Sequence, residues 1–283
     1  MQSLVIYGNE FDGHLSDGLM PQAYKYRFLV EGDSWMDRSS MFHTSLLQQL
    51  AREFDRTHES VLFINLAMFG DTMRRIGECA DDELRLWINT QFNWMFDAVL
   101  LSAGGNDYID AARDPAPGMG ILRSFVAMQP PTNAEQCVNK EALAKLVTQY
   151  LDPNFNVLYN QLRASHVGAA PIFLNFYDTP VARNAPAFPG GKAWLFEAYT
   201  KNGIPTDVWP ELTDYIFNDL QTTVAGWTKD QENIHIVQTN NTLNPAQSYA
   251  TGSSGDWLNE IHPNESGWRK LSAVWREAIK TAI

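Results

Sequence analysis

Short apolar runs alternate with longer segments of helical periodicity along the whole chain. Five runs rich in Val, Ile, Leu and Phe are short enough for buried strands, at residues 26–32, 61–67, 97–104, 170–178 and 233–239. Apolar residues recur at helical spacing in residues 40–56, 81–95, 140–165, 208–227 and 264–283. This alternation predicts βαβ units, and therefore an α/β fold with a mostly parallel sheet and right-handed crossovers. Residues 3–8 are a candidate for an extra edge strand.

Polar motifs follow the predicted strands. The sequence reads GDSW at 32–35, MFGDTM at 68–73, GGNDY at 104–108 and NEIHP at 259–263, and a long Pro/Gly/aromatic segment follows the fourth predicted strand. The carboxyl ends of parallel strands meet at one edge of an open sheet, which is where such folds bind ligands. We therefore expect these motifs to form one site.

Length and charge narrow the classes of function. The 283 residues carry a formal net charge of −12 and no basic run, which argues against nucleic acid or an anionic membrane as the main partner. No run approaches the ~20 apolar residues of a membrane helix, and the first residues lack the basic start of a signal peptide, so we expect a cytoplasmic protein. Without a repeat or a biased linker, we predict one domain, 1–283, with insertions at about 109–135 and 180–212.

The motifs that the sequence lacks exclude further classes. Cys79 and Cys137 are the only cysteines, and we expect them as unpaired thiols. Neither CxxC nor HExxH occurs, so we expect no metal and no cofactor. No glycine-rich phosphate loop supports nucleotide binding, and the absence of G-x-S-x-G argues against the α/β-hydrolase fold.

Ser34 and His262 are the candidates for nucleophilic chemistry. Gly32 lets the chain turn sharply at the strand end, which places Ser34 near the start of a helix with its backbone N–H free to face an anion. A serine hydroxyl needs a base within hydrogen-bond reach, and His262 is the natural one. The other five histidines, at 14, 43, 58, 166 and 235, are better explained as structural or surface residues. The plain alternative for GDS is a turn followed by a helix N-cap.

Three groups at the same edge are candidates for holding an oxyanion. The backbone N–H of Ser34, the backbone N–H of Gly70 and the side-chain amide of Asn106 would give three donors for one developing negative charge. The alternatives are a loop glycine at 70 and an ordinary Asn/Asp turn at 106.

The ordered set of motifs resembles the SGNH (GDSL-type) hydrolases. GDSW at 32–35 resembles the serine block, NLAMFGDT at 65–72 the glycine block, GGND at 104–107 the asparagine block, and NEIHP at 259–263 the histidine block. The resemblance implies a flavodoxin-like three-layer α/β/α fold with a five-stranded sheet and ester hydrolysis without a metal. It also implies Ser34 as nucleophile, Gly70 and Asn106 as oxyanion donors, and His262 as base.

The sequence departs from the family pattern at two positions. Trp35 replaces the Leu of the GDSL motif, and Asn259 stands where the family usually has an acid. An ionised acid fixes the imidazole tautomer and stabilises the imidazolium, whereas an asparagine brings no charge. Three alternatives are open: Asp256 could fold back to take the acid's role, Glu260, two residues from His262, could do so, or the site could be inactive. We predict a working Ser–His dyad with Asn259 as helper.

The insertions should cover the site. Five aromatic residues in 180–212 either line an acyl or alcohol pocket or pack the insertion onto the body: Phe188, Trp194, Phe196, Tyr199 and Trp209. The Pro-rich segment 109–135 would form the opposite wall. We predict an esterase or lipase-like serine hydrolase acting on a small-molecule ester. The alternative is a catalytically weak or inactive ligand-binding domain of the same fold, an alternative that Asn259 keeps open. The sequence carries no signature of the oligomeric state.

Overall fold

The predicted parallel sheet is present, but it has six strands rather than the five implied by the family resemblance. The computed structural model describes residues 1–37, 44–77, 82–114, 120–229 and 231–283. Its strands are β1 (Leu4–Tyr7), β2 (Tyr26–Gly32), β3 (Val61–Asn65), β4 (Ala98–Ser102), β5 (Ile172–Asn175) and β6 (Ile234–Val237). They pair in the order β1-β3-β2-β4-β5-β6, and every pair is parallel. Without β1 the order is that of flavodoxin-like folds, so the sixth strand is the edge strand that residues 3–8 suggested.

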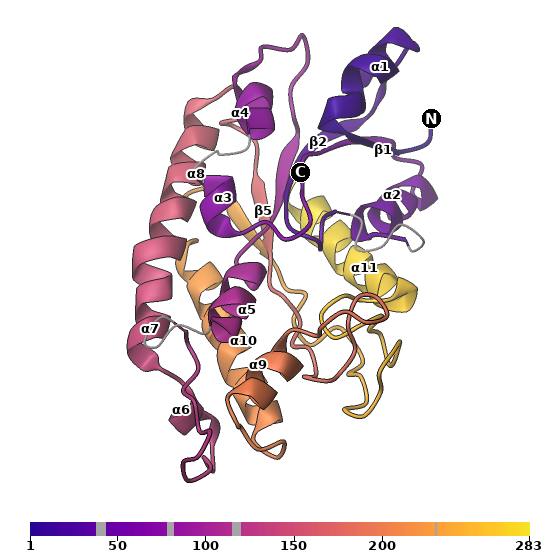
Figure 1. Cartoon of the computed structure of the whole chain (residues 1–283). Helices are drawn as coiled ribbons and strands as arrows, with labels where there is room; N and C mark the ends of the chain where they lie inside the picture. The colour runs from indigo at the N-terminus through magenta and orange to yellow at the C-terminus, as the bar shows by residue number, and fades with distance from the viewer. Residues whose placement is uncertain (38–43, 78–81, 115–119, 230) are drawn as a thin grey trace.

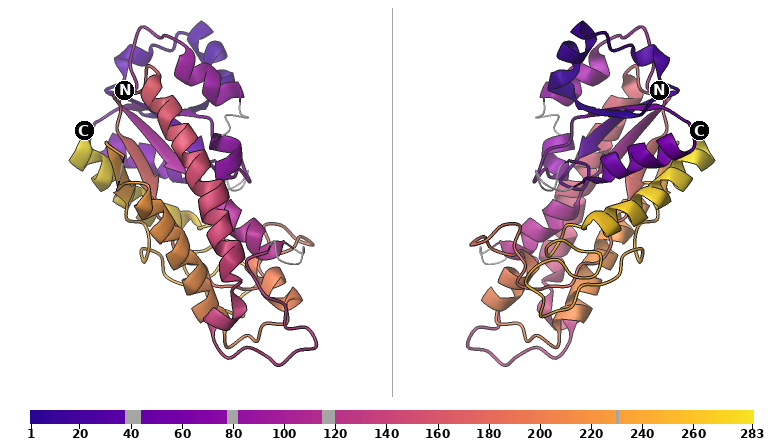
Figure 2. Two further views of the ribbon diagram at one scale, coloured as in Figure 1. Left: turned by 90° about the vertical axis from the view of Figure 1, so that its left-hand side faces the viewer. Right: turned by 90° about the vertical axis from the view of Figure 1, so that its right-hand side faces the viewer.

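Helices cover both faces of the sheet and make the three layers (Figure 1). On one face α2 (Leu46–Arg56) packs against α11 (Glu265–Ala282). On the other face lie α3 (Met73–Gly77), α5 (Gly105–Arg113), α8 (Asp152–Ala164) and α10 (Trp209–Gly226). Figure 2 shows the two faces in turn, with α8 and α10 in front in one view and α2 and α11 in the other. Both faces of the central strands β2 to β5 are therefore largely buried, which explains their continuous apolar runs, whereas the edge strands β1 and β6 are mostly half-buried.

Local capping explains where the predicted helices begin. Ser45 accepts a hydrogen bond from the backbone N–H of Gln48, so α2 begins at 46, and residues 40–43 of the predicted helix lie outside the described part of the chain. Asn264 accepts from the N–H of Gly267 and starts α11. The long helix expected at 140–165 is divided into α7 (Lys140–Lys145), a π-helical stretch η3 (Leu146–Leu151) and α8. Pro153 in the first turn of α8 lacks the N–H that a continuous α-helix would need there.

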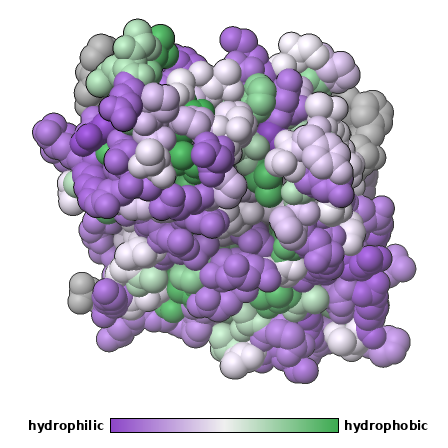
Figure 3. Space-filling model, turned by 90° about the horizontal axis from the view of Figure 1, so that it is seen from below, coloured by the Kyte–Doolittle hydropathy of each residue, from purple (hydrophilic) through white to green (hydrophobic). Residues whose placement is uncertain are grey.

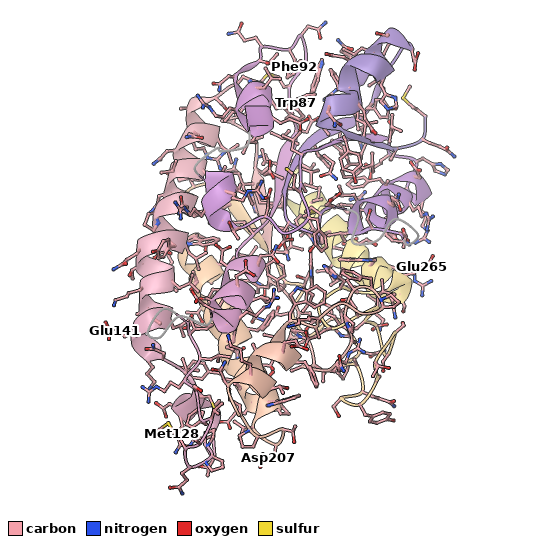
Figure 4. All side chains as sticks on the ribbon, viewed as in Figure 1. Trp87, Phe92, Met128, Glu141, Asp207 and Glu265 are labelled. Carbon is pink, nitrogen blue, oxygen red and sulfur yellow. The ribbon has the colours of Figure 1, made fainter. Side chains whose placement is uncertain are left out.

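The helix predicted at 81–95 is shorter than expected, because α4 spans only Asp82–Asn89. The aromatic residues that follow pack against one another instead of continuing the helix. The Phe92 ring stacks on Trp87 with centroids 5.1 Å apart, and Phe11 meets Trp87 edge-on. This cluster lies at the end of the molecule opposite Asp207 (Figure 4). It therefore stabilises the end of the fold away from the polar motifs.

The remaining elements are short. They are η1 (Gly8–Glu10), α1 (Phe11–Ser16), η2 (Pro21–Ala23), α6 (Ala134–Cys137) and α9 (Leu195–Lys201). Of the two cysteines, Cys137 is buried, and Cys79 lies outside the described residues. Within the described ranges, no helix is both long and apolar enough to cross a membrane.

The segments that follow the strands gather at one end of the molecule. The chain after β5, α9 and the loop that follows β6 all lie in the lower half of Figure 1. Figure 3 views the molecule from that side, where hydrophobic side chains form separate patches among hydrophilic ones. The sequence motifs are therefore carried to the same edge, as the alternation of strands and helices predicts.

Candidate active site

The turn after β2 holds Ser34 in a fixed position. Gly32 has a φ of +144°, and a Cβ on it would lie 2.3 Å from the carbonyl oxygen of Ser102 on the neighbouring strand β4. Only glycine fits there without moving the backbone. The next residue, Asp33, donates its backbone N–H to the same carbonyl at 3.0 Å, and its side chain accepts from the N–H of Trp35 at 2.9 Å. The residues on both sides of Ser34 are thus anchored.

The Asp33 carboxylate is buried, and its hydrogen bonds stabilise the turn that holds Ser34 rather than orienting His262. Its oxygens accept hydrogen bonds from the hydroxyls of Ser102 and Tyr177. Burial raises the pKa of Asp33 to about 6, although the hydrogen bonds from Tyr177, Trp35 and Ser102 act to lower it. Tyr177 could not be recognised from the sequence, because it lies within an apolar run that indicates only a buried strand.

Ser34 and His262 meet across the molecule. The hydroxyl oxygen of Ser34 lies 2.8 Å from Nε2 of His262, and both residues are buried. His262 comes from the loop that precedes α11, and Ser34 from the end of β2. Separated by 228 positions in the sequence, the two side chains have the geometry of a nucleophile and its base.

Asn259 lies on the other side of the imidazole. Its Oδ1 is 3.1 Å from Nδ1 of His262 and also accepts from the backbone N–H groups of Ile261 and His262, at 3.1 and 2.9 Å. Because two backbone donors point at this atom, it must be the amide oxygen rather than the nitrogen. The ring nitrogen facing it is then the one that carries hydrogen, so Nε2 presents a lone pair to Ser34. A neutral side chain thus selects the tautomer that a general base needs.

The two nearby acids are engaged elsewhere. Asp256 accepts from the backbone N–H of Asn244 at 2.7 Å and forms an ion pair with Lys270 of α11. Burial acts to raise its pKa, but the Lys270 ammonium and the N–H of Asn244 outweigh burial and hold the pKa below its usual value. The buried Glu260 carboxylate accepts from four backbone N–H groups in the 180–212 insertion. Burial raises its pKa to about 7 although these donors act to lower it. Of the alternatives weighed from the sequence, the structure thus brings Asn259 to Nδ1.

The surroundings of His262 keep the imidazole neutral. Burial lowers the pKa of His262 to about 4. The Trp194 ring lies edge-on to the imidazole with centroids 5.5 Å apart, and the Phe69 ring lies 5.8 Å from it on a tilt. No carboxylate is hydrogen-bonded to the ring among the described residues. His262 is therefore neutral above about pH 4.

Besides the Ser34 N–H, the candidate oxyanion donors lie in the turn after β3 and in the first turn of α5. Gly70, in the exposed turn between β3 and α3, has a φ of +82°. Asn106 is the second residue of α5, and its Nδ2 donates to the carbonyl of Asp71 at 2.9 Å. One amide hydrogen therefore ties Asn106 to the residue after Gly70, which leaves the second hydrogen for another acceptor. Ser34 and Asn106 line the same pocket, and Gly70 is not among the residues lining it.

That pocket is small, with a cavity volume of about 20 Å³. Ile109, Phe217 and Ile261 give it an apolar wall beside Ser34. Pro180 lines both this pocket and a second hollow of about 600 Å³. Four of the five aromatic residues of the 180–212 insertion divide between the two expected roles, and the exposed Phe188 takes neither.

Each of the five has a clear location. Phe196 and Trp209 line the second hollow, and Trp194 contacts His262. Tyr199 is fully buried and packs the insertion onto the body, while Phe188 is 66% exposed. The insertion thus supplies part of the wall around the site and part of its own packing.

Comparison with known proteins identifies the fold. No family model matches the chain, and no curated protein matches it. The lipase Lip_vut3 from a goat rumen metagenome aligns with a TM-score of 0.56 and 13% identity, over 90% of this chain and 97% of that one. A GDSL-like lipase from Parabacteroides merdae aligns with a TM-score of 0.51 and 13% identity, over 91% and 96% of the two chains. At such low identity the likeness establishes the architecture alone.

Proposed function

We propose that this chain, which has the SGNH (GDSL-type) hydrolase fold, is a serine hydrolase that cleaves carboxylic esters by acyl transfer. The observation that carries the proposal is the buried hydrogen-bonded series from Ser34 through His262 to Asn259. A histidine with a purely structural role needs neither a serine hydroxyl bonded to one ring nitrogen nor a partner at the other nitrogen that fixes the tautomer. The catalytic role requires both.

In the proposed reaction, the hydroxyl oxygen of Ser34 attacks the ester carbonyl carbon as its proton passes to Nε2 of His262. The carbonyl oxygen becomes an oxyanion, which the backbone N–H groups of Ser34 and Gly70 and the side-chain amide of Asn106 would stabilise. The C–O bond to the alcohol then breaks, and the imidazolium returns its proton to the leaving oxygen. Water repeats the sequence on the acyl-enzyme, releases the acid and restores Ser34.

Asn259 limits this mechanism in one respect and supports it in another. It supports the base by holding the tautomer with a lone pair on Nε2. It brings no negative charge, so the imidazolium that forms in the transition state is stabilised only by a dipole. We expect catalysis that is slower than in a site with an aspartate at this position, but not abolished. When an asparagine replaces the aspartate of a serine-protease triad, kcat falls because the histidine adopts the wrong tautomer, which the geometry around Asn259 avoids.

The pockets favour a short acyl group. The cavity beside Ser34, about 20 Å³, has room for little more than a water molecule and therefore excludes long acyl chains. We propose that it holds the acyl part and that the alcohol part extends past Pro180 into the larger hollow, where Trp209 and Tyr249 line the wall.

Labelling with a fluorophosphonate probe tests the proposed function. The purified protein should form a covalent adduct at Ser34, located by mass spectrometry of the digested protein. Ser34→Ala should remove the adduct and His262→Ala should lower its rate of formation sharply, while Ser16→Ala, at an exposed serine in α1, should leave it unchanged. If folded protein takes no label while a known serine hydrolase reacts beside it, the catalytic assignment fails. The ligand-binding alternative would then replace it.

A further inference from the structure

The loop that carries Asn259 and His262 has no helix or strand of its own. Residues 256–263 are held by turns and by isolated bridges from Trp257 to Ser254 and to Pro263. The backbone N–H of Leu258 donates to the carbonyl of His262 at 2.8 Å, which closes the loop on itself. The distances from Asn259 to His262 and from His262 to Ser34 therefore depend on the exact shape of an irregular segment.

A fully buried arginine from the insertion holds this loop. The guanidinium of Arg183 donates to three backbone carbonyls, those of Ala250, Gly252 and Asn259, at 2.8, 2.6 and 2.6 Å. Among the described residues, the guanidinium forms no ion pair with a carboxylate. Burying a charge is costly: burial lowers the pKa of Arg183, while the nearby Glu260 carboxylate acts to raise it, and the charge-assisted hydrogen bonds to the loop carbonyls offset part of the cost.

The peptide group between Asn259 and Glu260 is held at both of its polar atoms by the same segment. Its carbonyl accepts from the Arg183 guanidinium, and its N–H donates to the carbonyl of Ala185 at 2.9 Å. The Glu260 side chain in turn accepts from the backbone N–H of Arg183 at 3.0 Å. This peptide group follows the Cα of Asn259 directly, so its orientation sets the direction of the Asn259 side chain toward the imidazole.

Glu260 extends the same connection to the wall of the site. Its carboxylate accepts from the backbone N–H groups of Trp194, Leu195 and Phe196, at the start of α9. Trp194 is the residue whose ring lies against His262. The insertion thus contacts the His262 ring through Trp194 and fixes the backbone of Asn259 through Arg183.

We propose that Arg183 is a positioning residue for the reaction. Through the carbonyl of Asn259 it fixes the Asn259 oxygen against Nδ1, and thereby the tautomer of His262. This inference rests on the proposed function. An ionised acid would be attracted to the imidazole by charge, whereas a neutral amide must be held in place by the surrounding structure. A rigid loop therefore matters more for Asn259 than it would for an aspartate at the same position.

The test is a double-mutant cycle with a matched control. Arg163 also donates to backbone carbonyls, those of Gly168, Ala170, Glu232 and Asn233, near the opposite edge of the sheet. Arg183→Gln should slow fluorophosphonate labelling of Ser34 by about 10²-fold, the size of loss that a 1 Å misplacement produces. In an Asn259→Ala background the same change should cost less than about threefold, because the residue it acts through is gone. Arg163→Gln should cost about the same small factor in both backgrounds.

A second readout does not depend on activity. Long-range ¹H–¹⁵N spectra of the imidazole should show Nδ1 protonated and Nε2 unprotonated in the wild type and in Arg163→Gln, and mixed tautomers in Arg183→Gln. Should Arg183→Gln fail to fold, Arg183→Lys keeps the charge with fewer donors and should show a smaller change in the same direction.

The possible results separate the two proposals. Equal losses of labelling for Arg183→Gln in both backgrounds, with an unchanged tautomer, would overturn the positioning role. If the wild type takes no label but the tautomer still depends on Arg183, the proposed function fails, and Arg183 is shown to position the imidazole without a role in a reaction.

Discussion

Asn259→Asp places a carboxylate where a neutral amide now faces the imidazole. The oxygen lies 3.1 Å from Nδ1 of His262 and accepts two backbone N–H groups, an arrangement that suits a carboxylate equally well. Burial without an anion lowers the pKa of His262 to about 4. A negative charge at this distance favours the imidazolium and should raise that pKa by about 1 to 3.

The sign of the effect on activity follows from the need for a neutral base. In the wild type, kcat/KM should rise with pH through about 4 and stay level above that, because His262 is neutral there. In Asn259→Asp the rise should move to about pH 5 to 7. The level part should also be higher, by about 10- to 10²-fold, because the imidazolium formed in the transition state is now stabilised by charge.

The assay is kcat/KM for p-nitrophenyl acetate across the acid and neutral range, on protein that circular dichroism shows to be folded at each pH. Asn156→Asp adds the same charge on the exposed side of α8 and should leave the profile unchanged. The reasoning is refuted if the acid limb of Asn259→Asp stays at the wild-type position, or if its level part falls while the protein remains folded.

Three further changes test other parts of the site. Gly70→Ala and Gly18→Ala both place a side chain at positive φ in open space and should each lower the free energy of unfolding by about 1–2 kcal/mol. Only Gly70→Ala should also lower kcat. Equal kcat values for the two variants would argue against the Gly70 N–H as an oxyanion donor. Gly32→Ala should lower Tm strongly through its clash with β4, whereas Gly13→Ala meets no atom and should raise Tm or leave it unchanged, so similar melting curves would contradict the packing argument. Tyr249→Ala, at a side chain 79% exposed, should raise KM for esters of bulky alcohols but not for methyl esters; an equal KM change for both would place the alcohol elsewhere.

The placement of the motifs could be read from the sequence because it follows from strand periodicity. Parallel strands carry whatever follows them to one edge, so Ser34, Asn106 and His262 converge once the strands are identified. The extra strand β1 was harder to predict, because four residues give little periodicity. The helix at 81–95 was overestimated, because its aromatic residues fit helical spacing but pack more favourably in a loop.

The choice among the acids near His262 could not be made from spacing. Asp256 forms an ion pair with Lys270, a residue of α11 that reaches it only in the folded protein. The Glu260 carboxylate accepts hydrogen bonds from backbone N–H groups. Arg183 was missed for a similar reason. Its partners are backbone carbonyls, which every residue has, so no pattern of side chains marks them in the sequence.

The indole N–H of Trp35 donates to the carbonyl of Ile261 at 3.2 Å and so joins the residue after Ser34 to the residue before His262. These residues lie 226 positions apart, so the bond forms only after the chain has been synthesised as far as Ile261, near the end of its 283 residues. Domains fold as units while synthesis proceeds from the N-terminus. Until then, Ser34 is an ordinary alcohol with no base to activate it. Under the proposed function, the nascent chain would therefore not react with esters at Ser34, and this reactivity would begin only once the two ends of the site have folded together.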